Sequence, residues 1–193
     1  MAAPAPAAAR YTVERYFRLV DDGLLERDDR VELLEGVVVS MSPQNPPHAA
    51  TVSIVARTLG RLIGERGAVR TRLPFIAGPT SVPEPDVAVV PGREHEYATS
   101  HPTVALLVVE VGDTSLAQDR LTKAAIYAGA GVPQYLVVNV RDDCIEVFRS
   151  PDPAARTFAD VQIARRGEHL RLDALGDVDV LVDELLPPSP PVA

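Results

Sequence analysis

Two short segments of the chain are almost wholly apolar. Residues 86–90 and 104–111 consist of Val, Leu and Ala, apart from one acidic residue in each. Such runs are typical of central strands covered on both faces, because a strand with one wet face alternates polar and apolar side chains. Covering both faces of a sheet requires helices on each side of it. The sequence therefore predicts a mixed α/β fold with a central sheet flanked by helices.

Three helices are predicted around this sheet. The first begins at Thr12, an N-cap residue, and repeats apolar residues at helical spacing as far as Leu24. The second covers residues 48–63 and ends where glycines follow. The third covers residues 115–129 and opens with the Ser-x-x-Gln pattern of a capping box.

The other strand-like segments are rich in β-branched residues and are bounded by turns. A hairpin is predicted over residues 30–41, around the Glu35-Gly36 turn. Further strands are expected at residues 69–77, 134–140, 144–150, 158–164 and 169–172, before a short acidic element at 177–186.

Length and composition fit one domain. The chain has 193 residues, of which 46% are hydrophobic, and this is enough for one well-packed core. We predict a single domain over residues 11–186. The Ala/Pro segment at residues 1–10 and the Pro-rich segment at residues 187–193 are predicted to be tails, because their composition suits neither a helix nor a sheet interior.

The sequence predicts a soluble, cytoplasmic protein. Cys144 is the only cysteine, which excludes an intrachain disulfide and a thiolate-rich metal site. The first ten residues lack a basic leading segment and a continuous apolar core. No run approaches the roughly 20 apolar residues of a membrane span.

The charge balance excludes a globally basic surface for nucleic acid. The formal net charge is -8, so the molecule as a whole repels polyanions. Any contact with nucleic acid must be local or helped by a metal ion. Arg57 and Arg61, on the wet side of the second helix, are the candidate substrate-binding residues. They belong to a basic cluster of Arg57, Arg61, Arg66, Arg70 and Arg72.

Two acidic residues lie in the apolar segments, where an unpaired carboxylate is costly. Glu110 is inside the second segment, and Asp86 opens the first. Neighbouring strands could bring both carboxylates to one edge of the sheet, where the two negative charges repel each other. A divalent cation satisfies both at once, so the sequence predicts a metal site at Asp86 and Glu110.

The third helix offers a complementary charge. Asp119, Lys123 and Tyr127 are spaced four residues apart and share one helix face. A site of oxygen ligands beside an ammonium group suits metal-assisted hydrolysis of a phosphodiester, in which lysine orients the nucleophile or the phosphate.

These motifs resemble those of a known family. The sequence has Pro-Asp at residues 85–86, Glu-Val at 110–111, Asp-Arg-x-x-Lys at 119–123 and Tyr-Ala-x-Ala-Gly-Val-Pro-Gln-Tyr at 127–135. With the Arg-Val-Glu-Leu-Leu-Glu-Gly hairpin, they resemble the Uma-type restriction endonucleases of the PD-(D/E)-x-K nuclease superfamily. The resemblance implies a restriction-endonuclease-like core, in which a central mixed sheet is flanked by helices. It also implies a magnesium-dependent nuclease that acts on DNA.

The resemblance implies roles for individual residues. Asp86 and Glu110 would ligate Mg²⁺, for which Mn²⁺ is the expected substitute, and Lys123 would be the catalytic lysine. Glu32 and His48 would line the same cleft, Glu32 with a catalytic role and His48 in contact with the substrate.

One departure from the superfamily pattern concerns the lysine. The usual Glu-x-Lys motif is absent, because Gly112 stands where lysine would follow Glu110. The resemblance therefore requires Lys123 to reach the same point in space from the helix.

Each candidate also has a simpler structural interpretation. Asp86 could be an ordinary residue of a Pro-Asp turn, and Lys123 an exposed helix lysine paired with Asp119. Glu32 could face solvent on the hairpin, and His48 could be no more than a residue near a helix start.

Two other classes of function remain open at this point. A non-catalytic module that binds nucleic acid or protein could keep the fold, and the net charge of -8 favours it. A two-carboxylate glycoside hydrolase would need aromatic sugar platforms, whereas the chain has no tryptophan and 5% aromatic residues. A homodimer is a further expectation, because many nucleases that cut duplexes work in pairs.

Overall fold

A six-stranded mixed sheet runs through the centre of the molecule. The computed structural model describes residues 10–26, 29–113, 115–176 and 178–188. All neighbouring strands of the sheet are antiparallel except β5 and β6, which are parallel. In spatial order the strands are β3 (Gly67–Arg70), β4 (Val87–Pro91), β5 (Leu107–Gly112), β6 (Gln134–Asn139), β7 (Cys144–Asp152) and β8 (Thr157–Arg165).

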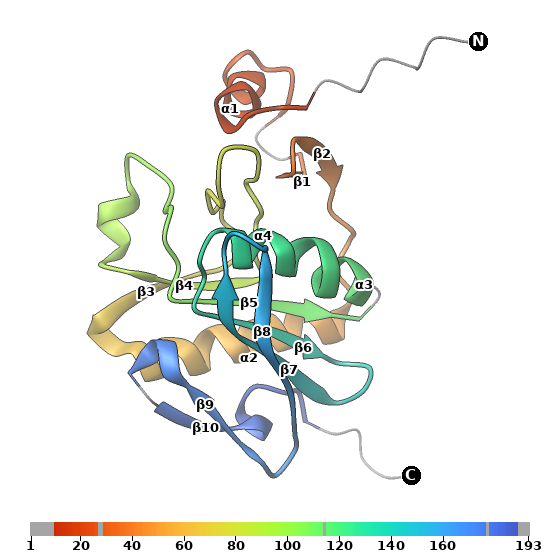
Figure 1. Cartoon of the computed structure of the whole chain (residues 1–193), viewed down its shortest axis with the longest axis vertical. Helices are drawn as coiled ribbons and strands as arrows, with labels where there is room; N and C mark the ends of the chain where they lie inside the picture. The colour runs from red at the N-terminus through yellow and green to blue at the C-terminus, as the bar shows by residue number, and fades with distance from the viewer. Residues whose placement is uncertain (1–9, 27–28, 114, 177, 189–193) are drawn as a thin grey trace, which may run out of the picture.

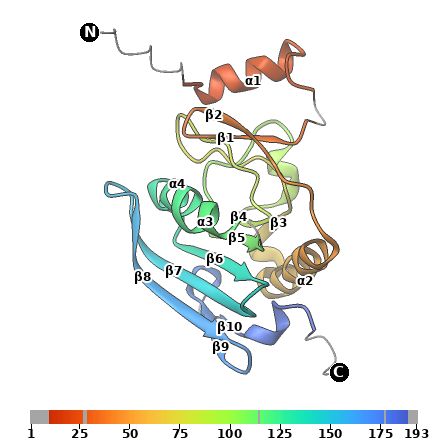
Figure 2. The same ribbon diagram turned by 90° about the vertical axis from the view of Figure 1, so that its right-hand side faces the viewer.

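Helices cover both faces of this sheet (Figures 1 and 2). On one face lies α2 (Pro46–Ile63), and on the other lies a helical segment that joins β5 to β6. That segment consists of α3 (Leu116–Gln118), a π-helical turn η3 (Asp119–Lys123) and α4 (Ala124–Gly129). The predicted fold, a central mixed sheet flanked by helices, is confirmed.

Smaller elements extend the molecule at two ends (Figure 1). At the N-terminal end, α1 (Val13–Asp21) lies above a hairpin of β1 (Val31–Leu34) and β2 (Val37–Ser40). At the other end, β9 (His169–Leu172) and β10 (Val178–Leu181) form a second hairpin. Short 3₁₀ turns are η1 (Gly64–Arg66), η2 (Glu94–Tyr97), η4 (Asp173–Leu175) and η5 (Val182–Glu184).

Strand alternation divides the core into two layers. Val87 and Val109, opposite each other on β4 and β5, face α2 and pack with its apolar residues. Ala88 and Val108 point to the opposite face, where they pack with residues of α4. Residues with even numbers on these two strands therefore face the helical segment that contains α4.

Several predicted boundaries are corrected by the structure. The strand expected over residues 69–77 is confined to β3, and Arg72 beyond it has a positive φ of 51°, which no regular strand permits. The first helix ends at Asp21 rather than near Leu24. The capping box is absent at Ser115, whose hydroxyl donates to the side chain of Asp119 instead of capping a backbone N–H.

Most of the two predicted tails, at residues 1–10 and 187–193, lie outside the described residues. The hairpin around Glu35 and Gly36 is confirmed, and both of these residues have a positive φ, as a tight two-residue turn requires. Within the described part of the chain, no helix is long and apolar enough to cross a membrane.

Two glycines near the contact of α2 with β3 should respond oppositely to alanine. In Gly60→Ala, the new methyl group meets only Val69 at 3.9 Å, so we expect about 0.5–1 kcal/mol of added stability from helix propensity. In Gly67→Ala, the methyl group would lie 2.6 Å from the carbonyl oxygen of Val90, so we expect a loss of about 1–3 kcal/mol. Urea denaturation measures both. Equal changes in the two variants would contradict this packing.

Candidate functional site

The pairing of β4 with β5 places Asp86 beside Glu110. Asp86 immediately precedes β4, and Val87 lies opposite Val109, one residue before Glu110. The backbone N–H of Asp86 donates to Glu110 Oε2 at 3.4 Å, and the N–H of Val111 donates to Asp86 Oδ2 at 2.9 Å. Both carboxylates are buried, so Asp86 is more than an exposed turn residue. The structure brings the two acids together at one edge of the sheet.

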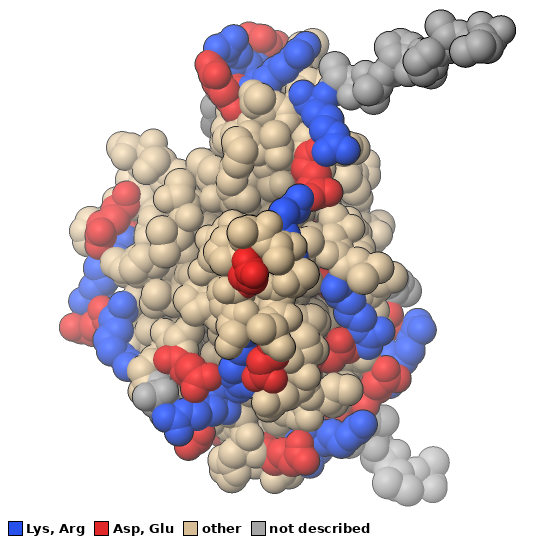
Figure 3. All heavy atoms as spheres, viewed as in Figure 1, with Lys and Arg blue, Asp and Glu red and all other residues tan. Residues whose placement is uncertain are grey.

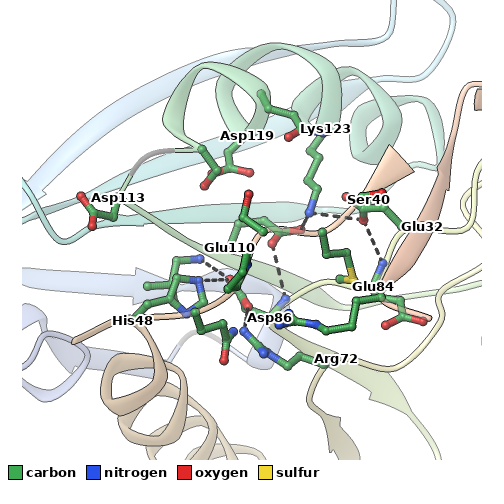
Figure 4. A pocket seen from close by; sticks show the side chains of 18 of the residues that line it. Glu32, Ser40, His48, Arg72, Glu84, Asp86, Glu110, Asp113, Asp119 and Lys123 are labelled. Atoms are coloured by element: carbon green, nitrogen blue, oxygen red, sulfur yellow. Dashed lines mark hydrogen bonds and ion pairs between the residues drawn. The ribbon is translucent and has the colours of Figure 1, made fainter. Parts of the chain in front are cut away.

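Lys123 reaches these acids from the helical segment (Figure 4). Its Nζ lies 3.0 Å from Glu110 Oε1 and 3.4 Å from Glu32 Oε2, and its side chain is 8% exposed. The hydroxyl of Tyr127 donates to the same Glu110 oxygen at 2.6 Å. The alternative of an exposed lysine paired with Asp119 is therefore wrong.

A π-helical turn directs two side chains into the pocket. Residues 119–123 form a single wide turn between α3 and α4, and such turns are frequent at functional sites. Asp119 at the start of this turn is 2% exposed and accepts a hydrogen bond from Ser115 Oγ at 2.7 Å. Asp119 and Lys123 both line the pocket (Figure 4). Asp119 was not among the predicted site residues, although its helix face was correctly identified.

Gly112, two residues after Glu110, lies against the start of the helical segment. A Cβ atom on Gly112 would lie 2.4 Å from Leu116 Cδ2 and 3.2 Å from Asp119 Oδ2. A side chain at position 112 would therefore require Leu116 and Asp119 to shift. The ammonium group beside Glu110 belongs to Lys123 on the helical segment.

Glu32 enters the site from the hairpin. It lies on β1, is 4% exposed, and accepts a hydrogen bond from the backbone N–H of Glu84 at 3.3 Å as well as contacting Lys123. The alternative of a solvent-facing glutamate is wrong. Glu32 thus connects the N-terminal hairpin to the sheet and to the helical segment.

The side chains of His48 and Arg72 flank Asp86. His48 Nε2, from the first turns of α2, lies 3.1 Å from Asp86 Oδ2, and Arg72 Nη2 lies 2.9 Å from Asp86 Oδ1. His48 is placed there because α2 begins beside the pocket, where Asn45 caps it by accepting from the N–H of His48. The structure therefore places His48 in the predicted cleft.

The other arginines of the predicted basic cluster do not reach this pocket. Arg57 and Arg61 line a separate groove between α2 and the C-terminal segment, where Arg61 forms an ion pair with Glu184. Arg66 donates to backbone carbonyls, and Arg70 stacks on Tyr97. Arg57 and Arg61, the predicted substrate-binding residues, therefore lie apart from the acids, because α2 points its wet side away from the pocket. Arg72 alone of the five lines the pocket.

The pocket holds more acidic than basic side chains. Six carboxylates line it, against three cationic side chains and His48. The acids are Glu32, Glu84, Asp86, Glu110, Asp113 and Asp119, and the cations are Arg30, Arg72 and Lys123.

Burial and the neighbouring charges shift the pKa values of the buried site residues. Burial raises the pKa of Glu110 to about 8, although Lys123 opposes the shift. Burial also acts to raise the pKa of Asp86, but hydrogen bonds from His48, Val111 and Arg72 outweigh it and hold the pKa below its usual value. Burial would lower the pKa of Lys123, yet the charges of Glu110 and Glu32 raise it, so the ammonium stays protonated.

The donor chemistry of the pocket fits a hard divalent cation. Mg²⁺ is usually held by one or two carboxylates and keeps several waters, and Asp86 and Glu110 provide such a pair. Burial first, and repulsion between neighbouring carboxylates second, raise the pKa values of Glu110, Glu84 and Asp119, and added positive charge would oppose both effects. Among the described residues, no group of three or more His, Cys, Asp or Glu side chains is arranged to hold a metal ion. Waters or substrate oxygens would therefore have to complete the coordination of an ion held by Asp86 and Glu110.

The sequence contains a signal for this site beyond the motifs. Lys123 is the only lysine among 19 basic residues, all the others being arginine. Lysine differs from arginine in having a compact ammonium group with three donors. Such a group fits between carboxylates, so the single lysine marks Lys123 as a candidate site residue.

The raised pKa of Glu110 predicts a pH-dependent stability. A carboxyl group with a higher pKa in the folded chain stabilises folding fully below its ordinary pKa of 4.5, and this contribution is lost as the pH rises through about 8. We expect the free energy of unfolding, measured by urea denaturation without divalent ions, to fall between about pH 5 and pH 8 by up to a few kcal/mol. The fall should be smaller in Glu110→Gln.

Glu146→Gln provides the matched control. Glu146 is also buried, but it is paired with Arg120 outside the pocket. It should keep the pH dependence of the wild type. If Glu110→Gln loses as much stability as the wild type over this range, Glu110 does not carry the raised pKa.

Comparisons with known proteins identify a family and a fold. The family model Uma2, described as "Putative restriction endonuclease", matches residues 13–183. A crystal structure described as a putative nuclease belonging to DUF820, from Anabaena variabilis, superimposes with a TM-score of 0.72 at 14% identity, over 91% of this chain and 97% of that one. At this identity the likeness shows the fold. No curated protein matches the chain. Since the family model spans most of the sequence, the chain belongs to the Uma2 family of restriction-endonuclease-like proteins.

Proposed function

We propose that the protein is a divalent-metal-dependent endonuclease that hydrolyses phosphodiester bonds in DNA. The observation that carries this proposal is the meeting of Asp86, Glu110 and Lys123 in one pocket, with the ammonium 3.0 Å from Glu110. Two adjacent carboxylates beside an ammonium group form the minimal set for metal-assisted attack on a phosphodiester. The family description of a restriction endonuclease supports DNA as the substrate.

Asp86 and Glu110 would hold Mg²⁺, or Mn²⁺ in its place. When bound, the ion would lower the pKa of a water molecule and offset the negative charge that develops on phosphorus. Other side chains would hold the two carboxylates in position. His48 orients Asp86 through its contact with Oδ2, and Tyr127 fixes Glu110 by donating to Oε1.

Lys123 would act as a fixed positive charge and hydrogen-bond donor. Its ammonium stays protonated, so it can donate to a phosphate oxygen or orient the attacking water, but it cannot serve as a general base. Glu32 positions it from the side opposite Glu110. An ammonium held between two carboxylates needs little reorganisation when substrate arrives.

The overall charge agrees with a need for added cations. On the face shown in Figure 3, acidic and basic side chains are interspersed, without a continuous basic surface among the described residues. With a net charge of -8, binding to DNA would depend on the local site and on the metal ion. The predicted homodimer, in which two copies each cut one strand of a duplex, and a cytoplasmic location belong to the same proposal.

The second candidate is a non-catalytic module that keeps the nuclease fold. It is favoured by the fact that Arg72, His48 and Lys123 already satisfy the two acids without any metal. This candidate binds nucleic acid or protein but produces no cleavage.

Replacement of Lys123 separates the two candidates. We expect Lys123→Met to lower Mg²⁺-dependent cleavage of a duplex DNA by about 10²- to 10⁴-fold, the range for loss of one positioned electrostatic or proton-transferring group. Arg120→Met is the matched control, because Arg120 lies in the same π-helical turn but pairs with Glu146 outside the pocket. It should cleave at close to the wild-type rate.

Cleavage is measured on duplex DNA, single-stranded DNA and RNA, and circular dichroism confirms that each variant is folded. Equal rates for the two variants would remove Lys123 from the mechanism. A wild type that binds nucleic acid but gives no metal-dependent product from any of these substrates would establish the non-catalytic module.

A further inference from the structure

Arg72 is held beside Asp86 by an unusual backbone conformation. It lies two residues beyond the end of β3 with a φ of 51°, in the left-handed region that an arginine enters only at a cost in conformational energy. Its backbone N–H donates to the carbonyl of Pro85, the residue before Asp86, at 3.0 Å. The loop that carries Arg72 is thus tied to the turn that carries Asp86, and the guanidinium is aimed at the pocket.

The carboxylate of Asp86 has three polar contacts in this arrangement. Oδ1 accepts from Arg72 at 2.9 Å, and Oδ2 accepts from the Val111 N–H at 2.9 Å and contacts His48 at 3.1 Å. A divalent cation binds a carboxylate oxygen directly, at a distance shorter than any of these contacts. A guanidinium on the same carboxylate would repel that ion, so the ion would bind more tightly once Arg72 moves away.

Of the three donors, Arg72 has the longest and most exposed side chain. The Val111 N–H belongs to the backbone of the central strand β5, and His48 is fixed to the capped start of α2. Arg72 has a long side chain on a loop, and 28% of that side chain is exposed to the pocket and solvent. Rotation about its side-chain bonds would free the guanidinium without unfolding any element.

A released guanidinium would lie where substrate arrives. Its planar fork donates two parallel hydrogen bonds to a phosphate, which an ammonium cannot do. Arg70, two residues earlier in sequence, is stacked on Tyr97 at 5.3 Å and points elsewhere. We infer that Arg72 is the phosphate-binding residue of this site and is held on Asp86 until a divalent cation takes that carboxylate. The inference rests on the proposed nuclease function.

The test compares Arg72→Gln with Arg70→Gln, which removes the same charge from the same stretch of chain but leaves the pocket intact. In the first measurement, isothermal titration calorimetry gives the affinity of the metal-free protein for Mn²⁺ without DNA. We expect Arg72→Gln to bind Mn²⁺ roughly three- to tenfold more tightly than the wild type, because a competing cation is gone. Arg70→Gln should differ from the wild type by less than about twofold.

In the second measurement, fluorescence anisotropy gives the affinity for a labelled duplex DNA in Ca²⁺, which is used as a cation that does not support cleavage. We expect Arg72→Gln to bind the duplex about tenfold more weakly than the wild type does, and Arg70→Gln to bind it nearly as well. Tighter Mn²⁺ binding together with weaker DNA binding in Arg72→Gln would show that the arginine leaves Asp86 to bind the DNA. A residue with a merely structural role would weaken both.

Arg72→Lys guards against a folding defect in the glutamine variant. It keeps the positive charge, so the affinity for Mn²⁺ should stay near the wild-type value. The affinity for DNA should fall, because an ammonium group cannot donate two parallel hydrogen bonds to a phosphate. The inference is overturned if Arg72→Gln and Arg72→Lys match Arg70→Gln in both measurements, or if either binds Mn²⁺ more weakly than the wild type. A wild type that binds Mn²⁺ but cleaves no substrate contradicts the proposed function instead.

Discussion

The site depends on one buried ammonium group between two buried carboxylates. Lys123 comes from the π-helical turn, Glu110 from the central strand β5 and Glu32 from the N-terminal hairpin, and each is less than a tenth exposed. A buried charge without a partner costs several kcal/mol, so these elements pack favourably only when all three side chains meet. The contact that joins these three elements is therefore also the contact that forms the candidate site.

The position of the lysine follows from the close approach of the helical segment to β5. Leu116 and Asp119 lie against Gly112, so a lysine at this position, two residues after Glu110, would require both side chains to shift. A lysine four residues beyond Asp119 on a wide turn reaches Glu110 from above the sheet (Figure 4). The helical segment, rather than strand β5, thus supplies the ammonium group of the site.

The fold and the two acids could be predicted because their signals are local. Apolar runs predict covered strands, and a carboxylate within such a run, as at Glu110, demands a partner whatever the partner is. The arginines could not be assigned in this way. Arg57, Arg61 and Arg72 have the same charge, and only the direction of α2 and the left-handed backbone at Arg72 decide which of them faces Asp86. The π-helical turn was equally hidden, since no residue pattern distinguishes it from an α-helix.

The most direct measurement of the central claim uses the fact that Lys123 is the only lysine in the chain. Protein labelled with ¹⁵N-lysine has a single side-chain Nζ signal in its NMR spectrum, and a bound paramagnetic Mn²⁺ broadens signals of nuclei close to it. If Asp86, Glu110 and Lys123 share one cation-binding pocket, one equivalent of Mn²⁺ should broaden this signal in the wild type and leave it sharp in Asp86→Asn. A signal that stays sharp while Mn²⁺ is bound to the wild type would place the ion elsewhere and contradict the account.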